Sequence, residues 1–252
     1  MAVMAKASMP GRTKTRLVPP LTHDEAAALN TAFLRDAADS VLAAAALADI
    51  SGWMAYAPAG SEAFFRQHVP KGIDLIETVA PVLGECLLRA ADALLQAGHQ
   101  SVCLLNADSP TLPVGYLVTA AAALAAPDDR IVLGPTADGG YYLIGMRRPH
   151  EGLFRNIDWS TERVFRQTLA RAGELGLPVV QLPVWYDVDD ADTLRRVAEE
   201  LLDERRPGPP GSVASAARWT RAYLADRLAA TDLGIRLGSI ASQGQKADGG
   251  KQ

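Results

Sequence analysis

Short apolar runs alternate along this chain with longer segments whose apolar residues recur at helical spacing. Leu83–Ala97 places its apolar residues on one helical face, and the compact apolar run Ser101–Leu105 follows it directly. Alternation of this kind is typical of strand–helix–strand units built around a mostly parallel sheet. The sequence therefore predicts a Rossmann-like α/β domain, in which a mixed, mostly parallel sheet is flanked by helices on both faces.

The same pattern predicts the individual elements. The predicted strands are Val3–Ala5, Trp53–Ala57, Ile73–Ile76, Ser101–Leu105, Arg130–Leu133, Tyr141–Met146 and Val179–Pro183. The predicted helices of this domain are Glu25–Ala48, Glu62–His68, Leu83–Ala97, Gly115–Ala126, Thr161–Leu175 and Asp190–Arg205. Gly98 is expected just past the end of the third helix, and Asp190 is expected to be the N-cap of the last.

Composition divides the chain into a main domain and a C-terminal extension. Residues 1–205 form one domain by their element pattern, and the Pro- and Gly-rich residues 206–211 are a predicted linker. The extension, 212–252, contains one predicted helix, Val213–Leu228, and a Gly-, Ser-, Gln- and Lys-rich end that is predicted to be disordered. The helix is a candidate for packing on the domain or on a second subunit, so homo-oligomerisation stays open.

Charge and cysteine content indicate a cytoplasmic protein that acts on small molecules. The formal net charge of −4 argues against bulk binding to nucleic acid or to a membrane surface. No apolar run approaches the roughly 20 residues that a membrane-spanning helix needs. Cys86 and Cys103 lack metal-ligand spacing and are expected to be buried free thiols in a reducing compartment.

A Gly-containing basic segment, Pro10–Arg16, follows the first predicted strand. Gly11 permits a tight turn, and Arg12, Lys14 and Arg16 provide three cations within five residues. Ligands of open α/β sheets bind beyond the carboxyl ends of the strands, so this segment suits a phosphate chain. It matches neither of the common glycine-rich phosphate fingerprints, and an exposed basic turn is the alternative interpretation.

Acidic segments follow two other predicted strands. Asn106 and Asp108 come directly after the fourth strand, and Asp187 and Asp189 come after the last. Alternation along an extended segment puts Asp187 and Asp189 on the same side. Because Mg²⁺ prefers one or two carboxylates together with phosphate oxygens, these three aspartates are candidate metal ligands. The alternative is that Asp108 only opens a turn and that the later acids belong to the capping region that Asp190 begins.

A further glycine-rich segment, Gly134–Tyr142, lies between two predicted strands. Asp138, Gly139 and Gly140 are typical of a hairpin turn. Adjacent glycines also allow the backbone to approach a ligand closely, with Asp138 able to bind a hydroxyl or act as a base. Trp159–Thr161 is expected to cap the helix that follows it. The four histidines are scattered and not paired with a nucleophile, so a catalytic triad is not indicated.

Taken together, these segments resemble the radical-SAM/selenodomain-associated transferases, bacterial glycosyltransferase-like proteins of the nucleotide-diphospho-sugar transferase (GT-A) superfamily. The family pattern runs approximately A-K-x-P-x-P-G-x-x-K-T-R-L, G-x-D-x-P, G-P-x-x-D-G-G-Y-Y-L-I-G, W-S-T and D-V-D-T-x-x-D-L. The matching segments are Ala5–Leu17, Asn106–Pro110, Gly134–Gly145, Trp159–Thr161 and Asp187–Leu194. They span about residues 3–200, and the third is highly specific. Asn106 stands where the family has Gly, and Asp190 where it has Thr.

The resemblance implies a single GT-A domain, a fold shared with guanylyltransferases that make molybdenum-cofactor and F420 precursors. It implies that the basic loop lies over phosphates, and that Asp108, often with Asp189, holds Mg²⁺ or Mn²⁺. The nucleotide-binding residues expected on this basis are Gly11, Arg12, Lys14, Arg16, Asn106, Gly139 and Gly140.

These features favour nucleotidyl transfer from a nucleoside triphosphate to a small phosphorylated acceptor, with release of pyrophosphate. Positioning and charge neutralisation dominate such chemistry, and Lys14 and Arg16 would stabilise the departing pyrophosphate. One alternative is glycosyl transfer from a nucleotide-diphospho-sugar, with Asp138 as the catalytic base. A second is a non-catalytic nucleotide-sensing protein that has kept the fold.

Overall fold

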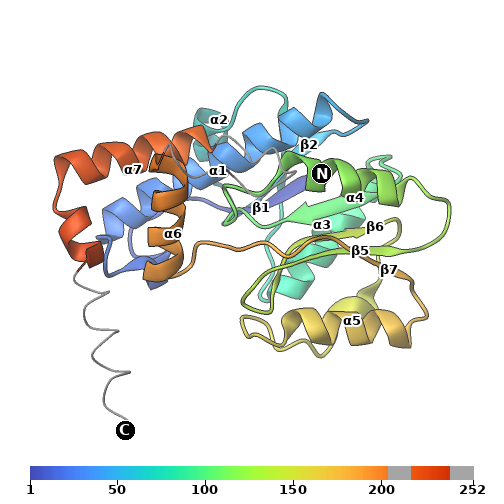
Figure 1. The fold of residues 1–252 in the computed structure, drawn as a ribbon. Helices are drawn as coiled ribbons and strands as arrows, with labels where there is room; N and C mark the ends of the chain where they lie inside the picture. Colours follow the sequence, from blue (N-terminus) through green and yellow to red (C-terminus); the bar gives the residue numbers. More distant parts are fainter. Residues whose placement is uncertain (204–216, 239–252) are drawn as a thin grey trace, which may run out of the picture.

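The computed structural model describes residues 1–203 and 217–238, and a single seven-stranded sheet lies at its centre (Figure 1). The strands, in chain order, are β1 Ala2–Lys6, β2 Gly52–Ala57, β3 Ile73–Glu77, β4 Val102–Leu105, β5 Ile131–Pro135, β6 Tyr141–Met146 and β7 Val179–Gln181. Their spatial order is β3-β2-β1-β4-β6-β5-β7. β6 runs antiparallel to β4 and β5, and the other neighbouring pairs are parallel. The predicted mixed, mostly parallel sheet is confirmed.

Helices cover both faces of this sheet (Figure 1). On one face lie α1 His23–Ala45, α2 Glu62–His68, α4 Val114–Leu124, α6 Ala191–Leu202 and α7 Arg218–Ala230. On the other lie α3 Leu83–Gln96, α5 Val164–Glu174 and the 3₁₀ helix η2 Glu151–Phe154. A second 3₁₀ helix, η1 Thr15–Leu17, follows the basic loop. The fold class predicted from the alternating pattern is therefore correct.

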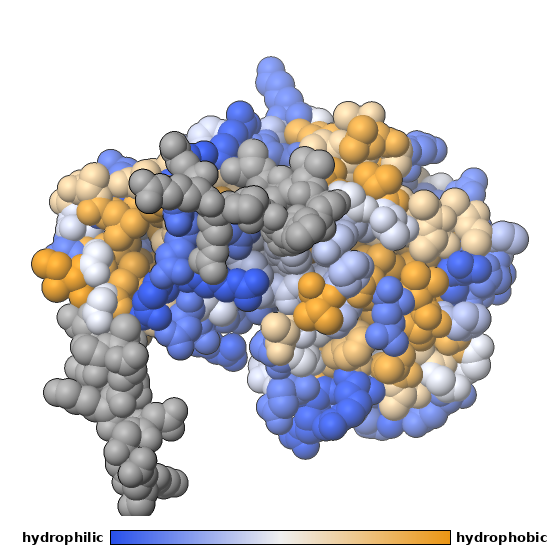
Figure 2. All heavy atoms as spheres, in the orientation of Figure 1, coloured by the Kyte–Doolittle hydropathy of each residue, from blue (hydrophilic) through white to orange (hydrophobic). Residues whose placement is uncertain are grey.

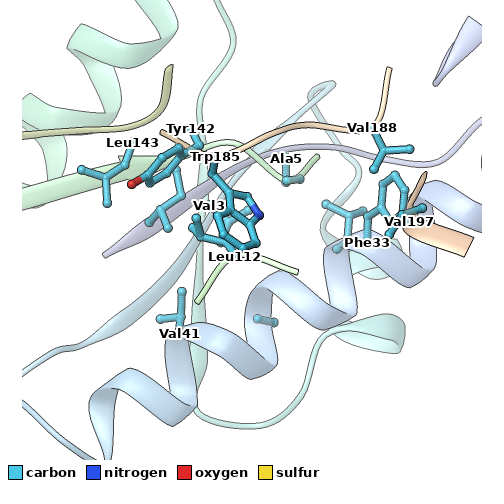
Figure 3. Close-up of a cluster of buried hydrophobic side chains, with 14 of the residues drawn as sticks. Val3, Ala5, Phe33, Val41, Leu112, Tyr142, Leu143, Trp185, Val188 and Val197 are labelled. Atoms are coloured by element: carbon cyan, nitrogen blue, oxygen red, sulfur yellow. The ribbon is translucent and has the colours of Figure 1, made fainter. Parts of the chain in front are cut away.

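Alternation along the strands divides the core into two clusters, one on each face. Val3 and Ala5 of β1 enter the cluster under α1, whereas Ala2 enters the cluster under α3. The residues labelled in Figure 3, among them Phe33 and Val188, belong to the cluster on the α1 side. Because Val188 is fully buried there, the chain on either side of it is fixed close to the sheet edge.

Local sequence signals set several helix ends, and two of them, at Asp190 and Gly98, were predicted. Asp190 accepts a hydrogen bond from Thr193 N at 2.8 Å and is the N-cap of α6. Gly98 follows the C-cap of α3 with φ 101°, a conformation that glycine adopts without strain. At the start of α1, Thr22 and Glu25 form a reciprocal capping box, with bonds of 3.2 and 2.8 Å.

The C-terminal helix α7 docks on α1 of the same chain. The buried carboxylate of Asp36 accepts hydrogen bonds from Trp219 N at 3.0 Å, Thr220 N at 2.8 Å and Thr220 Oγ1 at 2.6 Å. Burial raises the pKa of Asp36, and the three hydrogen bonds only partly oppose this shift. Of the two packing partners considered for this helix, the structure places it on its own domain.

Some predicted boundaries differ from those observed. α5 begins at Val164 rather than Thr161, because the Thr161 hydroxyl donates to Asp158 O and accepts from Arg163 N, which keeps these residues in a turn. α7 spans Arg218–Ala230 rather than 213–228, and a further helical turn covers 233–238. The predicted linker 206–211 and the predicted disordered end 239–252 lie outside the described residues.

The surface mixes hydrophobic and hydrophilic residues on the face drawn in Figure 2. Within the described residues, large hydrophobic side chains at the surface are scattered over several elements, among them Leu47, Val82, Leu175 and Ile235. A search of the same residues finds no helix long and apolar enough to cross a bilayer. Both cysteines are free thiols, as expected, and Cys103 is buried, whereas Cys86 is half-buried in contrast to the prediction.

Candidate functional site

A cavity of about 620 Å³ lies at the sheet edge where β1, β4 and β7 end. Its walls come from residues 12–16, 106–108, 159–162 and the individual positions 136, 138, 140, 141, 187 and 189, together with side chains of β1, α1, α3 and α5. Ligands of open α/β sheets bind at this edge. The volume is within the range of small-molecule sites, about 300–1,000 Å³. Segments far apart in the sequence therefore meet in one candidate site.

The basic loop is folded into a tight turn that carries Lys14 into this cavity. Met9 O accepts hydrogen bonds from Arg12 N at 3.0 Å and from Thr13 N at 3.2 Å, and the Thr13 hydroxyl also donates to Met9 O. Lys14 itself has φ 50°, in the left-handed region that side chains other than Gly, Asn and Asp rarely adopt. Leu17, fully buried, anchors the end of the loop in the core. Strain of this kind is typical of functional positions.

The Lys14 ammonium lies between two carboxylates. Its Nζ is 2.9 Å from Asp108 Oδ1 and 2.7 Å from Asp189 Oδ1, and it donates to Val188 O at 2.8 Å. The Lys14 side chain is 6% exposed, against about a third for each carboxylate. Burial alone would lower the pKa of Lys14, but the two carboxylates outweigh burial and raise it. Arg16 stands at the solvent side, 3.6 Å from Asp189 Oδ2.

Backbone hydrogen bonds hold the two acidic segments together. Val188 N donates to Asp108 O at 2.9 Å, which joins the end of β4 to the segment after β7. Asn106 N donates to Tyr142 O at 2.9 Å, whereas its side-chain oxygen is buried without a partner among the described residues. A buried polar atom without a partner is uncommon, and Asn106 lines the cavity. Its amide oxygen is therefore free to accept a hydrogen bond from a ligand.

Asp187 and Asp189 both line the cavity, while Val188 between them is buried in the core. The alternation predicted for this segment is confirmed. Burial raises the pKa of Asp187 to about 7, and the neighbouring charges, of which Asp138 is the largest, act in the same direction. This side of the cavity thus carries an excess of negative charge that a bound cation would relieve.

The β5–β6 hairpin brings Asp138 to the same cavity. The Asp138 carboxylate accepts hydrogen bonds from Thr136 Oγ1 at 2.5 Å and from Gly140 N at 3.1 Å, so it closes the turn. Gly139 has φ 91°, and a Cβ added there would lie 2.1 Å from Glu162 O. The hairpin-turn interpretation is therefore correct: one Asp138 oxygen accepts both bonds, and the residue lines the cavity.

The opposite wall contains residues that the sequence did not identify as part of a site. Trp159 and Ser160 line the cavity with Leu83 of α3, and a Cβ added to Gly84 would lie 2.7 Å from the Trp159 ring. The predicted helix-capping role of Trp159–Thr161 is wrong, because α5 has no side-chain cap. These residues line the cavity instead. Trp159 belongs to one of the segments that match the family pattern, and this match could have identified it as a site residue.

Polar residues on β1 and α1 complete the floor. Asn30 of α1 lines the cavity and donates to Lys6 O at 3.2 Å and to Ser8 Oγ at 2.8 Å. Sequence reasoning missed Asn30 because it treated α1 only as an apolar packing helix. Asn30 is the one amide side chain among the apolar residues of this helix, and that isolation could have identified it as a candidate site residue.

The residues present fit a divalent cation. Asp108 and Asp189 both reach one ammonium nitrogen, so a compact cation at that point would be within reach of both carboxylates. Within residues 1–203 and 217–238, no group of three acidic, His or Cys side chains is gathered closely enough to enclose a metal. Two carboxylates suffice for Mg²⁺ when phosphates and water supply the remaining ligands.

Most predicted site residues are brought together. Those that line the cavity are Arg12, Lys14, Arg16, Asn106, Asp108, Asp138, Gly140, Asp187 and Asp189. Gly11 and Gly139 do not line it, in contrast to the prediction that they contact the nucleotide. Both have positive φ, 71° and 91°, so their role is to permit the turns that carry their neighbours.

Two solved structures show what this chain is similar to. The chain is 26% identical to a putative nucleotide-diphospho-sugar transferase from Desulfovibrio desulfuricans G20, with a TM-score of 0.73 over 89% of this chain and 96% of that one. A CMP:2-keto-3-deoxy-manno-octonic acid synthetase, solved in complex with CTP, matches with 13% identity and a TM-score of 0.51 over 81% of this chain and 98% of that one. At that identity the second likeness concerns the fold alone.

A family model described as an uncharacterized protein conserved in bacteria (DUF2064) matches residues 33–161, just over half of the chain. No protein with a curated description matches the sequence. The matched range contains Asp108, Asp138 and Trp159, whereas Lys14 and Asp189 lie outside it. The narrower radical-SAM/selenodomain-associated assignment stays a prediction.

Proposed function

We propose that this chain, which belongs to the DUF2064 family, is a divalent-metal-dependent nucleotidyltransferase that joins a nucleoside-triphosphate-derived nucleotide to a small phosphorylated acceptor. One observation carries the proposal. The Lys14 ammonium and the carboxylates of Asp108 and Asp189 meet within 2.9 Å at a cavity that Arg12 and Arg16 also line. Two carboxylates that converge on one ammonium, next to two arginines, suit a metal–polyphosphate ligand.

The proposed reaction is a displacement at the α-phosphorus. An oxygen of the acceptor phosphate forms the new P–O bond, and the bond from the α-phosphorus to the bridging oxygen breaks, so that pyrophosphate leaves. Because the acceptor phosphate is already an anion, no strong base is required. A Mg²⁺ or Mn²⁺ ion bound by Asp108 and Asp189 would supply charge neutralisation at the α-phosphate.

The basic residues would act on the leaving group. Lys14, Arg12 and Arg16 offer charged donors to the β- and γ-phosphates and stabilise the charge that develops on pyrophosphate. Lys14, held by a buried chain, would keep one orientation, while Arg16 is exposed and free to adjust. Asn106 would accept a hydrogen bond from a ribose hydroxyl through its unpartnered oxygen.

Glycosyl transfer from a nucleotide-diphospho-sugar is the second candidate. It is favoured by the similarity to the Desulfovibrio protein and by Asp138, which lines the cavity and would be the base of an inverting reaction. In that case Asp138 removes the proton of an acceptor hydroxyl, and a nucleoside diphosphate leaves in place of pyrophosphate.

Product release distinguishes the two reactions. The protein is incubated with Mg²⁺ or Mn²⁺, a panel of triphosphates or of nucleotide sugars, and mixed sugar and polyol phosphates, while pyrophosphate and nucleoside diphosphate are measured. We expect thermal stabilisation by at least one triphosphate and release of pyrophosphate. Stabilisation by nucleotide sugars alone would overturn the leading proposal, and binding without turnover would favour a nucleotide sensor.

Matched variants test the metal site. Asp108→Asn removes a charge at almost constant volume, and it should abolish the metal dependence of triphosphate binding. Asp74→Asn makes the same change at an exposed position of the edge strand β3, and it should leave binding unchanged. Equal metal dependence in the two variants would show that Asp108 does not hold the cation.

A further inference from the structure

The C-terminal segment contacts the chain that follows the basic loop and the helix that follows Asp189. Its residues 217–238 comprise α7 and a helical turn at 233–238. Leu224, Leu233 and Leu237 of this segment are buried in the core cluster that α1 and α6 cover. The segment is therefore integrated into the domain, although it lies beyond the range that the family model matches.

Arg236 attaches this segment to the exit of the basic loop. Its guanidinium donates to both carboxylate oxygens of Glu25, at 2.9 Å each, and to the backbone oxygen of Pro20. Glu25 is the residue whose carboxylate accepts the Thr22 N–H in the capping box of α1. Only 24% of the Arg236 side chain and 11% of the Glu25 side chain are exposed, so solvent screens this pair weakly.

The same turn holds the segment that carries Asp189. Arg195 of α6 donates to Leu237 O at 3.0 Å, one residue beyond Arg236. α6 begins at its N-cap Asp190, the residue next to Asp189. Arg236 and Leu237 therefore connect the chain just after the basic loop with the helix that follows Asp189.

We infer that Arg236 is a positioning residue for the polyphosphate site, acting through Glu25 and Pro20 on the basic loop. This inference rests on the proposed function, because it assigns the loop a phosphate ligand. Only two residues separate Pro20 from Leu17, the residue at the end of the loop. A displacement of Pro20 is thus transmitted to Lys14 and Arg16 and changes their distance from Asp189.

A double-mutant cycle tests the inference, with inorganic pyrophosphate and Mg²⁺ as the probe. Arg236→Gln removes the bidentate pair, and Glu25→Gln removes the same pair while retaining an N3 residue that can complete the capping box. Each single variant should weaken pyrophosphate binding about threefold to thirtyfold in calorimetry, a typical size for such coupling. The double variant should bind no more weakly than the weaker single variant, because both substitutions remove one interaction.

Amide hydrogen exchange gives a readout that does not depend on the ligand. Leu17 N donates to Lys14 O and Leu21 N to Leu17 O, so both amides report the order of the loop. Both should exchange faster in Arg236→Gln than in the wild type at a temperature where each protein is folded. In Asp232→Asn, which removes only the exposed i,i+4 partner of Arg236, exchange and affinity should stay unchanged.

The outcomes separate the inference from the function on which it rests. A lower melting temperature for Arg236→Gln, with unchanged pyrophosphate affinity and unchanged exchange at Leu17, would show that Arg236 only stabilises the fold and would overturn the inference. Lys14→Met should lose binding in the same assay. If wild type and Lys14→Met bind pyrophosphate equally or not at all, the proposed function fails, and the positioning of a phosphate site fails with it.

Discussion

Lys14 shows at the scale of one residue how the candidate site depends on the fold. Its ammonium is nearly buried, and the charges that keep it ionised come from Asp108 and Asp189, 94 and 175 positions away in the sequence. Removal of one member of a buried ion pair leaves the other charges without compensation. The same residue therefore contributes to stability and to the proposed ligand binding.

Lys14→Met should destabilise the protein, because it leaves two carboxylates facing each other. Breaking a buried pair costs about 3–5 kcal/mol, and we expect the lower end because both carboxylates are about a third exposed. Mg²⁺ should then raise the melting temperature of the variant more than that of the wild type, since the cation would replace the lost positive charge. Differential scanning calorimetry with and without Mg²⁺ measures both effects.

Lys71→Met is the matched control, because Lys71 is exposed in the turn before β3. We expect its stability and its response to Mg²⁺ to equal those of the wild type within about 0.5 kcal/mol. If Lys14→Met has the same stability as this control, the buried charge contact is not formed in solution.

Residue types at strand ends were predictable from the sequence, whereas contacts between them were not. Asp108 and Asp189 were identified because each follows an apolar run, which any parallel sheet brings to one edge. That Lys14 contacts both depends on the left-handed turn at Lys14, which no local propensity favours. Trp159 was assigned to a cap because its partner, Gly84, is distant in the sequence.

At the scale of elements, the docking of α7 depends on one carboxylate of α1. Asp36 satisfies three buried donors at the start of α7, from Trp219 and Thr220. The sequence predicted a helix in this region but not its partner, because an aspartate among the alanines of α1 is equally compatible with a solvent-exposed face. Asp36 is buried, and the donors of these three hydrogen bonds all belong to α7.

Asp36→Ala should lower the free energy of unfolding by about 3–4 kcal/mol, since each buried donor left without a partner costs about 1–3 kcal/mol. Asp39→Ala, one turn later on α1, removes a more exposed contact with Arg218 and Trp219 and should cost about 1 kcal/mol or less. Urea denaturation of both variants measures the difference. Equal losses would contradict the assignment of Asp36 as the main docking residue.

The Glu25–Arg236 pair should give this interface an acid-sensitive component. The hydrogen bonds from Arg236 hold the pKa of Glu25 below its usual value of 4.5. A carboxyl whose pKa is lowered by folding stabilises the protein above its unfolded pKa, and this contribution disappears as the pH falls through the folded pKa. The wild type should therefore exceed Glu25→Gln in stability at pH 7, and the difference should shrink below pH 4.5. Urea denaturation at pH 7, 4 and 3, roughly spanning the transition, measures it; a difference independent of pH would refute this role of the pair.

At the scale of the whole molecule, the order of the strands explains why the position of the site could be predicted from the sequence. The arrangement of its side chains could not. β1, β4 and β7 are far apart in sequence, yet their carboxyl ends lie on one edge because the strands that contain them run in the same direction. β6 is the exception, and as an antiparallel strand it returns the chain so that the hairpin with Asp138 faces the same edge. Hydrophobic periodicity predicts the strands, but strand order depends on tertiary packing.

A ligand that binds across this edge should stabilise the molecule as a unit. At a concentration of 100 times its Kd, a ligand specific for the folded state adds about 2.7 kcal/mol to the free energy of unfolding. For a chain of this length that corresponds to a rise in melting temperature of about 5–11 °C. We expect this rise when Mg²⁺ and a triphosphate are present together, and a much smaller rise with either alone. The carboxylates would bind the metal and the basic loop the phosphates, so each component alone would make only some of the contacts.

Hydrogen exchange locates that stabilisation. Protection should increase in four separate segments, 9–17, 106–109, 136–140 and 187–190, since each contributes to the cavity wall. Segments remote from the edge, such as the end of α3 before Gly98, serve as internal controls and should be unaffected by a local effect of binding. Protection confined to 9–17 would mean that the basic loop binds phosphate alone, and the aspartates of the other segments would then have no part in the ligand site.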